Sequence, residues 1–210
     1  MVRLELRSVS RTERSFTLPP CSGDFSSGRP VTLFGMNGAG KTTLLRCMAG
    51  LVGHKGDIET VADSRIAVFD PPDFYHRMSC LDNLRLLLTS FPSSVDTHML
   101  REALASAGLG DVMNVRVGHI STGQRKLLGF LLANLSLSDL VLLDEITEGV
   151  DDDGLAWMRE RVMASCSKRL WFLAGHDRAF SASVGAEEFT LDERGIAPSG
   201  AVSKREGHAP

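Results

Sequence analysis

Two glycines, a lysine and a threonine between positions 35 and 42 have the types and the spacing of a phosphate-binding loop. The segment reads GMNGAGKTT, with four residues between Gly35 and Gly40 and with Lys41 and Thr42 directly after them. Glycines let main-chain N–H groups curl around phosphate oxygens, and a helix beginning near Lys41 adds its positive N-terminal end. Lys41 is predicted to neutralise the β- and γ-phosphates, and the Thr42 hydroxyl to hold Mg²⁺. The residues predicted to bind nucleotide here are Gly35, Met36, Asn37, Gly38, Ala39, Gly40, Lys41, Thr42 and Thr43.

Two adjacent carboxylates follow an apolar run at residues 140–145, which read LVLLDE. A buried strand would deliver Asp144 to the Mg²⁺ shell, and Glu145 could accept a proton from an attacking water. A strand that merely ends in solvated acids gives the same pattern. The phosphate-binding loop in the same chain favours the metal and base roles.

A serine before an apolar helix is the third candidate. Residues 120–124 read ISTGQ, and Ser121 is suited to capping the helix that follows. The N–H groups at such a helix start could bind another anion. In isolation, an ordinary capped helix is the better explanation of this segment.

Taken in order along the chain, these segments resemble the nucleotide-binding subunit of an ABC transporter. The resemblance rests on GMNGAGKTT, ISTGQ, LVLLDE, the triplet Gly149-Val150-Asp151 and His176, and it covers nearly the whole chain. It implies that ISTGQ is the signature loop, in which Ser121, Gly123 and Gln124 contact ATP held by a second cassette. It also implies that Asp151 lies in a loop at the dimer interface and that His176 contacts the γ-phosphate.

The same resemblance implies an ATPase whose hydrolysis is coupled to transport. Its catalytic residues would be Lys41, Glu145 and His176, its ligands ATP and Mg²⁺, and its metal-binding residues Thr42, Asp144 and Asp70. The chain is expected to form a homodimer, or a heterodimer with a related cassette, when ATP binds. Its other expected partner is an integral membrane transporter subunit, which places it at the cytoplasmic face of a membrane.

Four positions depart from the pattern of the family. Thr122 stands at the second glycine of the signature loop, and Ile146 stands where a proline is usual. Asp70 is the nearest candidate for the glutamine that links Mg²⁺ to the helical lobe. No aromatic residue lies between Ser10 and Arg14 to stack on adenine; Phe16 is the closest substitute, although a core strand residue is the favoured interpretation.

Other functions remain open. The altered residues favour an ATP-dependent dimerisation or regulatory module with little turnover, whereas Glu145 and His176 favour hydrolysis. A chromosome-type ABC ATPase would carry long coiled coils and a translation-type one two cassettes, and neither is present here. A small-molecule kinase would have no use for ISTGQ. The segment from Asp70 to Met78, with Phe74 and Tyr75, is the expected contact with the membrane subunit, and core packing explains it equally well.

Composition agrees with one soluble α/β domain spanning residues 1–210. The chain is 43% hydrophobic and 23% charged, a balance that excludes disorder, and its net charge of -3 provides no basic field for nucleic acid. Its four cysteines, Cys21, Cys47, Cys80 and Cys166, are too far apart for a zinc site and favour a reducing cytosol. The most apolar stretch, residues 127–143, is too short and too polar to span a bilayer.

The hydrophobic pattern predicts the elements that position these residues. We expect an α/β fold: a P-loop NTPase core with a mostly parallel sheet, a small N-terminal antiparallel β part, a helical lobe inserted at about 72–135, and a flexible tail at about 198–210. Strands are predicted at 2–7, 14–18, 31–34, 57–61, 65–69, 140–143, 170–174 and 188–191. Helices are predicted after Lys41 and at 81–88, 99–107, 121–135, 154–164 and near Ala179. Pro19-Pro20 is predicted to end the second strand, and residues 21–30 to form a turn-rich connection.

Overall fold

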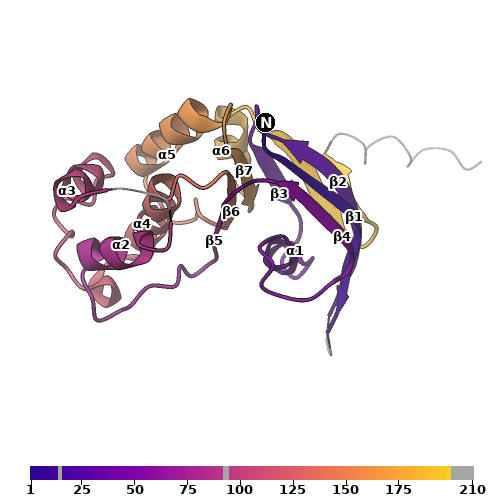
Figure 1. Cartoon of the computed structure of the whole chain (residues 1–210), viewed down its shortest axis with the longest axis horizontal. Coiled ribbons are helices and arrows are strands. Elements are labelled where there is room, and N and C mark those ends of the chain that lie inside the picture. Colours follow the sequence, from indigo (N-terminus) through magenta and orange to yellow (C-terminus); the bar gives the residue numbers. More distant parts are fainter. Residues whose placement is uncertain (14–15, 92–94, 200–210) are drawn as a thin grey trace, which may run out of the picture.

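Nine strands form two sheets in the computed structural model of this chain, which describes residues 1–13, 16–91 and 95–199. Six of them form one sheet in the order β5-β6-β7-β3-β8-β9, parallel except for the antiparallel edge strand β9. The other three form an antiparallel sheet in the order β2-β1-β4 (Figure 1). The strands are β1 (Arg3–Thr12), β2 (Thr17–Ser26), β3 (Val31–Phe34), β4 (Lys55–Val61), β5 (Arg65–Val68), β6 (Leu140–Asp144), β7 (Leu170–Ala174), β8 (Glu187–Asp192) and β9 (Gly195–Pro198).

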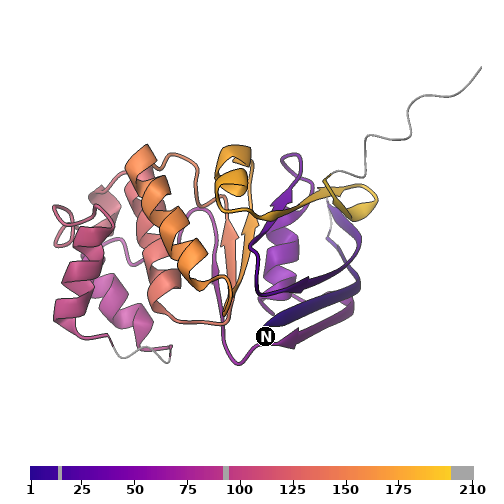
Figure 2. The same cartoon turned by 90° about the horizontal axis from the view of Figure 1, so that it is seen from above.

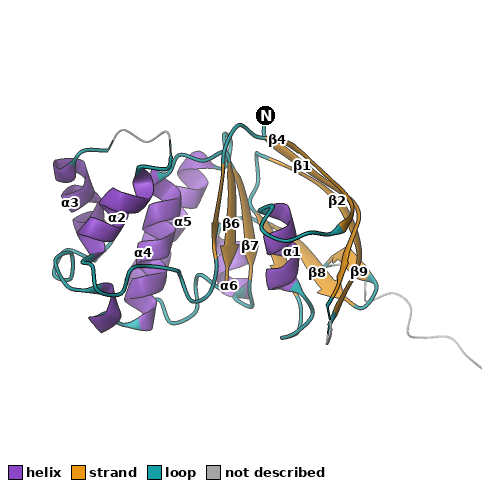
Figure 3. Ribbon diagram, turned by 60° about the horizontal axis from the view of Figure 1, so that its bottom comes forward, coloured by secondary structure: helices purple, strands orange, loops and turns teal. Residues whose placement is uncertain are grey.

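Helices cover both faces of the six-stranded sheet. Figure 3 shows α2 to α5 on one face and α1 on the other, where α1 lies between this sheet and strands β1, β2 and β4. Seen from above, α2 and α3 lie at the end of the molecule farthest from the antiparallel sheet (Figure 2). The helices are α1 (Lys41–Met48), α2 (Cys80–Leu88), α3 (Thr97–Ser106), the single 3₁₀ turn η1 (Val117–His119), α4 (Thr122–Leu135), α5 (Asp152–Ser165) and α6 (Arg178–Ser183). The predicted α/β fold is therefore confirmed, while the exact limits of the helical lobe stay a prediction.

Strand β6 shows why the sheet needs cover on both faces. Val141 and Leu143 pack into the core beneath the helical lobe, whereas Leu140 and Leu142 pack into a second core against α1 and the antiparallel sheet. All four are fully buried. Successive side chains of a strand point to opposite faces, so a strand buried on both faces reads as a continuous apolar run.

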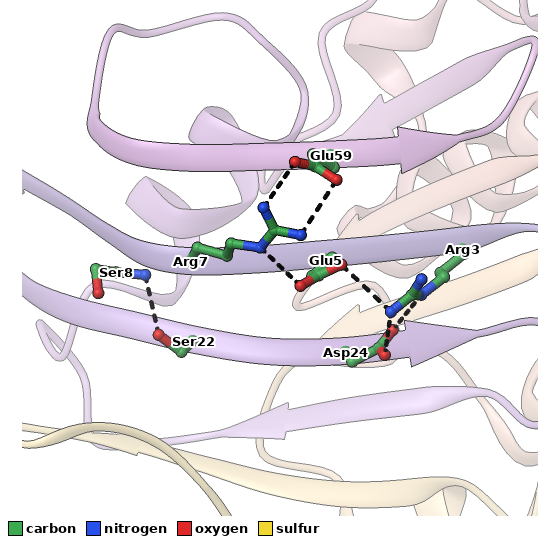
Figure 4. Close-up of polar contacts among 7 residues, drawn as sticks. All are labelled: Arg3, Glu5, Arg7, Ser8, Ser22, Asp24 and Glu59. Carbon is green, nitrogen blue, oxygen red and sulfur yellow. Dashed lines mark hydrogen bonds and ion pairs between the residues drawn. The ribbon is translucent and has the colours of Figure 1, made fainter.

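The antiparallel sheet has only one buried face, and β1 alternates accordingly. Leu4 and Leu6 are buried, whereas Arg3 and Arg7 are exposed. The exposed side chains pair across the strands: Arg3 donates to Asp24 of β2 at 2.6 Å, and Arg7 donates to Glu59 of β4 at 2.9 Å (Figure 4). Solvent-exposed pairs of this kind contribute little stability, but they keep the outer face polar.

Strand β2 differs from the prediction. Pro19 and Pro20 do not end it, and residues 21–26, expected in a turn-rich connection, continue the strand to Ser26. The two prolines lie between Leu18 and Cys21, where the pairing with β1 is irregular, and β2 is an edge strand. Proline has no N–H to donate to a ladder, and at an irregular edge position none is needed.

Further expectations are revised near the C-terminus. Strand β9 was not predicted, and it pairs with β8 around the left-handed Gly195, so the start of the expected tail at Pro198 is part of the sheet. Most of that tail, residues 200–210, lies outside the described residues. So do Arg14, with which the second predicted strand begins, and Pro92, which lies in the link between the helices predicted at 81–88 and 99–107.

The described residues contain four cysteines, and their helices can be examined for a membrane span. All four cysteines are free thiols, and burial raises the pKa of the Cys21 thiol to about 12. Within the described part of the chain, we find no helix that combines the length and the apolar character needed to cross a membrane.

A buried arginine donates hydrogen bonds to carbonyl groups at the C-terminal end of α4. Arg169 is 7% exposed, and its guanidinium donates to the carbonyl oxygens of Ala133 at 2.7 Å, Asn134 at 3.2 Å and Ser138 at 2.7 Å. It also lies 4.7 Å from the centre of the Trp171 ring. The last carbonyl groups of a helix have no partner within the helix. Arg169 donates to two of them and to Ser138 just beyond, and the Ala133 carbonyl oxygen also accepts from the Ser136 hydroxyl at 2.8 Å. Burial lowers the pKa of Arg169 to about 10.

Arg169→Met is therefore expected to lower the free energy of unfolding by about 2–4 kcal/mol, because buried carbonyl groups lose their donors. Urea unfolding followed by circular dichroism measures this. Arg159→Met, on the exposed side of α5, is the matched control and should change stability by less than about 0.5 kcal/mol. Equal effects of the two variants would show that Arg169 does not hold the end of α4.

Candidate active site

The loop between β3 and α1 has the backbone of an anion cradle. Gly38 and Gly40 have φ values of 83° and 106°, in the left-handed region that glycine adopts without strain. Gly40 is the N-cap of α1 and provides no side chain to satisfy the first N–H groups of the helix. Those N–H groups have no acceptor within the helix and are available to an anion. A Cβ at Gly40 would also lie 2.7 Å from the Phe16 ring, so a larger residue there would require this ring to shift.

Lys41 and two residues far away in sequence converge beside this loop. Lys41 is 6% exposed, and its Nζ lies 3.1 Å from His176 Nε2 and 3.4 Å from Glu145 Oε1. Glu145 Oε1 lies in turn 3.3 Å from His176 Nε2. Asn37 of the loop completes the group, with its Oδ1 2.8 Å from His176 Nε2. The structure therefore brings together the three residues predicted to be catalytic.

Thr42 and Asp144 form the second half of the site. Thr42 Oγ1 donates a hydrogen bond of 2.6 Å to Asp144 Oδ2, while the other carboxylate oxygen, Oδ1, is buried without a hydrogen-bond partner. Burial raises the pKa of the Asp144 carboxyl, against the hydrogen bond from Thr42, which lowers it. A buried carboxylate with a vacant oxygen and an adjacent hydroxyl is a donor set that suits Mg²⁺.

Thr42 and Asp144 are the protein groups that could bind Mg²⁺ here. Among the described residues there is no cluster of three or more His, Cys, Asp or Glu side chains arranged to hold a metal. Mg²⁺ binds through one or two carboxylates and keeps phosphate and water ligands. Thr42 and Asp144 therefore fit as its protein ligands beside a bound triphosphate, and the ion would supply neutralisation of phosphate charge there.

Glu145 has a strained main chain. Its φ is 48°, in the left-handed region, which is rare for a residue with a side chain. Its N–H donates to the Ala174 carbonyl oxygen at 2.8 Å, which ties the end of β6 to the end of β7. Strain of this kind persists only where the surroundings hold it, and it is found at functional sites.

Asp70 lines the hollow that contains Thr42 and Asp144, but its carboxylate forms an ion pair with Lys126. A hollow of about 490 Å³ is lined by Asp70 together with the phosphate-binding loop and the two carboxylates at the end of β6. Asp70 Oδ1 lies 3.3 Å from the ammonium nitrogen of Lys126, on α4. Its role as a metal ligand stays a prediction.

The segment predicted to be the signature loop, residues 120–124, lies away from the phosphate-binding loop. Ser121 caps α4 by accepting a hydrogen bond from the Gln124 N–H, and the Gln124 side chain accepts one from the Ser121 N–H. Ser121, Gly123 and Gln124 line a separate hollow of about 500 Å³ that does not include Lys41. A Cβ at Gly123 would lie 2.0 Å from the Gly149 carbonyl oxygen, so glycine is required where this loop meets the segment before α5.

Comparison with known proteins identifies the family. The model of the ABC transporter family matches residues 18–148, which is more than half of the chain. The chain belongs to this family.

Curated relatives agree. The chain is similar to an uncharacterized ABC transporter ATP-binding protein of Bacillus subtilis, with 29% identity over 157 residues, 69% of this chain and 51% of the relative. It is also similar to the cytochrome c biogenesis ATP-binding export protein CcmA of Vibrio cholerae, with 31% identity over 171 residues, 73% of this chain and 80% of that protein. The chain spans about half to three fifths of the length of the first relatives that it matches.

Solved structures share the fold. An ATP-binding subunit of an ABC transporter superposes with a TM-score of 0.80 at 21% identity, covering 93% of this chain and 90% of the other. A dimeric ATP-binding cassette in a post-hydrolysis state, bound to ADP and Pi, superposes with a TM-score of 0.79 at 16% identity, covering 93% of this chain and 98% of the other.

The structure places three further residues that the sequence analysis singled out. Thr122 is exposed at the start of α4, and Ile146 is 3% exposed and packs into the core beneath the helical lobe. Asp151, expected at the dimer interface of an ABC cassette, is exposed and also caps α5 by accepting from the Gly154 N–H at 2.8 Å.

The structure places two aromatic residues for which the sequence left alternatives open. Phe16 is not a strand residue: it precedes β2, is half-buried, packs against the core between α1 and the antiparallel sheet, and lines the hollow beside Gly40. Phe74, one of the three apolar residues Phe74, Tyr75 and Met78 in the expected contact with a membrane subunit, is 6% exposed and belongs to the core, which was the alternative explanation. Tyr75, its neighbour, is 55% exposed.

Lys126 is the residue near the site that sequence reasoning missed. It is 2% exposed, and its ammonium contacts Asp70 and the main chain of Glu145. The available signal was a lysine within the apolar run of the helix, where Leu127 and Leu128 follow it. A charged side chain at such a position is buried only with partners.

Asp144→Asn is expected to raise the free energy of unfolding of the nucleotide-free protein at pH 7 by about 1 kcal/mol, because it removes a buried charge that lacks a full set of partners. The raised pKa of Asp144 means that the folded state retains a proton that the unfolded state has lost. The stability of the wild type therefore falls as pH rises above about 3.9, the ordinary value for Asp, and the advantage of Asn should vanish near that pH.

Urea unfolding at pH 7 and at about pH 4 measures both values. The exposed Asp111 gives the control variant Asp111→Asn, which should show no such difference. An Asp144→Asn protein that is less stable than the wild type at pH 7 would contradict the electrostatic interpretation.

Proposed function

We propose that this chain hydrolyses ATP as a subunit of an ABC transporter and transmits the energy to a separate integral membrane subunit. The observation that carries the proposal is the convergence of Lys41, Glu145 and His176, with 3.1–3.4 Å between their polar atoms, beside an anion cradle. Family membership supports ATP binding by this cradle. A glycine-rich phosphate loop alone would fit many nucleotide-binding functions, whereas a positioned base favours turnover.

The proposed reaction uses groups whose positions are described above. Lys41 is drawn to the β- and γ-phosphates of ATP and leaves Glu145, whose carboxylate then accepts a proton from the attacking water. His176 donates a hydrogen bond to the γ-phosphate through a ring N–H. Thr42 and Asp144 provide the oxygen ligands for Mg²⁺. The N–H groups at the start of α1 stabilise the charge that develops on the phosphates.

The proposed partners are a second cassette, identical or related, and a membrane subunit at the cytoplasmic face. Ser121, Gly123 and Gln124 lie in a hollow separate from Lys41, as an arrangement in which they serve the partner's ATP requires. Exposed Tyr75, on the segment after Asp70, is the proposed contact with the membrane subunit. Relatives are named for lantibiotic transport, cytochrome c biogenesis and zinc import, so their names favour no single cargo.

Glu145→Gln is expected to lower the steady-state ATPase rate by about 10²–10⁴-fold, because the amide cannot accept the proton. ATP affinity should remain, since the phosphate cradle is unchanged. The measurement is phosphate release by purified protein, with and without membrane extract. Glu160→Gln, on the exposed side of α5, is the matched control and should keep the wild-type rate.

Turnover that survives Glu145→Gln would exclude Glu145 as the base. A wild-type chain that binds ATP and dimerises, but shows no turnover even with a membrane partner, would favour the alternative function, an ATP-dependent dimerisation or regulatory module.

Ser121→Asp is expected to abolish the ATP-dependent dimer. Aspartate caps a helix as well as serine does, so α4 should keep its start, but its charge would repel the phosphate of ATP held by the partner. Light scattering in the Glu145→Gln background, with saturating ATP, should show a monomer whose ATP affinity is unchanged. Ser121→Asn, a neutral cap of the same shape, is the control and should still form a dimer. Equal dimerisation of the two variants would show that Ser121 does not face a partner's nucleotide.

A further inference from the structure

A buried lysine on α4 lies against the main chain of Glu145. Lys126 Nζ donates to the Glu145 carbonyl oxygen at 2.7 Å, and it lies 3.3 Å from Asp70 Oδ1 and 3.2 Å from Glu148 Oε2. The ammonium donates hydrogen bonds to the Glu145 carbonyl oxygen and to Glu148, and it forms an ion pair with Asp70. Only 2% of this side chain is exposed, so these partners replace water almost entirely.

The main-chain groups of Glu145 are held from two sides. Its N–H donates to the Ala174 carbonyl oxygen, and its own carbonyl oxygen accepts from Lys126. The residue between these two contacts has a φ of 48°. A left-handed conformation costs about 1–3 kcal/mol at a residue with a side chain, so the two contacts hold a conformation that the isolated segment would leave.

Asp70 lies on the other side of the same ammonium. It follows β5, lines the hollow with Thr42 and Asp144, and faces Lys126 with one carboxylate oxygen. Lys126 therefore contacts the segments that follow β5 and β6 and belongs itself to α4, the helix that begins at the signature loop. A buried ion pair is strongly sensitive to the loss of one partner, which makes its contribution measurable.

We propose that Lys126 is a positioning residue for the base: its ammonium holds the Glu145 main chain in the left-handed conformation and takes Asp70 as its counter-ion. Asp70 then acts through Lys126 rather than as a ligand of Mg²⁺. The catalytic consequence rests on the proposed function, because it assumes that Glu145 accepts the proton from water. The structural consequence, a fixed Glu145 main chain, does not.

The first test compares Lys126→Met, Lys126→Gln and the exposed-lysine control Lys168→Met. Lys126→Met should lower kcat by about 10- to 100-fold, because a displaced base loses its alignment with the attacking water. KM for ATP and ATP affinity should stay near the wild-type values, since Lys126 does not contact the phosphate cradle. Lys126→Gln retains an N–H donor for the Glu145 carbonyl group and should recover part of kcat. Lys168→Met should behave as the wild type.

The second test needs no turnover. Amide hydrogen exchange in the nucleotide-free chain should be faster across residues 144–150 in Lys126→Met than in the wild type or in Lys168→Met, because the strained segment has lost one of its holds. Asp70→Asn should leave the Mg²⁺ concentration for half-maximal ATP-dependent dimerisation unchanged in the Glu145→Gln background.

The outcomes separate this inference from the proposed function. A wild type without turnover would contradict the proposed function, and the exchange rates would then decide the inference alone. An unchanged exchange rate in Lys126→Met, or a loss of ATP affinity as large as the loss of kcat, would overturn the positioning role. A roughly tenfold higher Mg²⁺ requirement of Asp70→Asn would assign Asp70 to the metal and overturn its role as counter-ion.

Discussion

The burial of negative charge at the end of β6 is the constraint on which the rest of this structure depends. Asp144 is 3% exposed, and the Glu145 carboxylate lies beside it. Carboxylates removed from water need cations or hydrogen-bond donors close by. Lys41 at the start of α1 reaches the Glu145 carboxylate from one face of the sheet. Lys126 on α4, on the other face, contacts the Glu145 carbonyl oxygen and the Asp70 carboxylate. The helices on both faces of the sheet therefore each bring a lysine to the segment that carries the two acids.

A parallel sheet is suited to gathering these groups because the carboxyl ends of its strands meet at one edge. The neighbouring strands β5, β6, β7 and β3 lead, in that order, into Asp70, Glu145, His176 and the phosphate-binding loop. None of these residues is near the others in sequence, apart from those within the loop itself. The order of the strands places them side by side, and the hydrophobic interior on both faces fixes the strands that end there.

Features that depend on a few consecutive residues could be predicted from the sequence. The phosphate-binding loop, the two acids after an apolar run and the capped helix at Ser121 each depend on a few consecutive residues, and their elements lie where their patterns indicated. The continuation of β2 through its two prolines depends on its place at a sheet edge, which is a property of the pairing and not of the segment. The burial of Phe74 and the place of Phe16 beside Gly40 depend on partners distant in sequence.

Lys126 shows the same limit at the site. Its helix was predicted, but a lysine among leucines does not reveal which oxygens it meets, because those oxygens come from the ends of β5 and β6. What the structure adds is that α4 is held at its start by its capping box, along its length by Lys126, and at its end by Arg169. Its 14 residues form a rod of about 20 Å. The same helix therefore carries Ser121 at its start and the ammonium group that holds the Glu145 carbonyl oxygen.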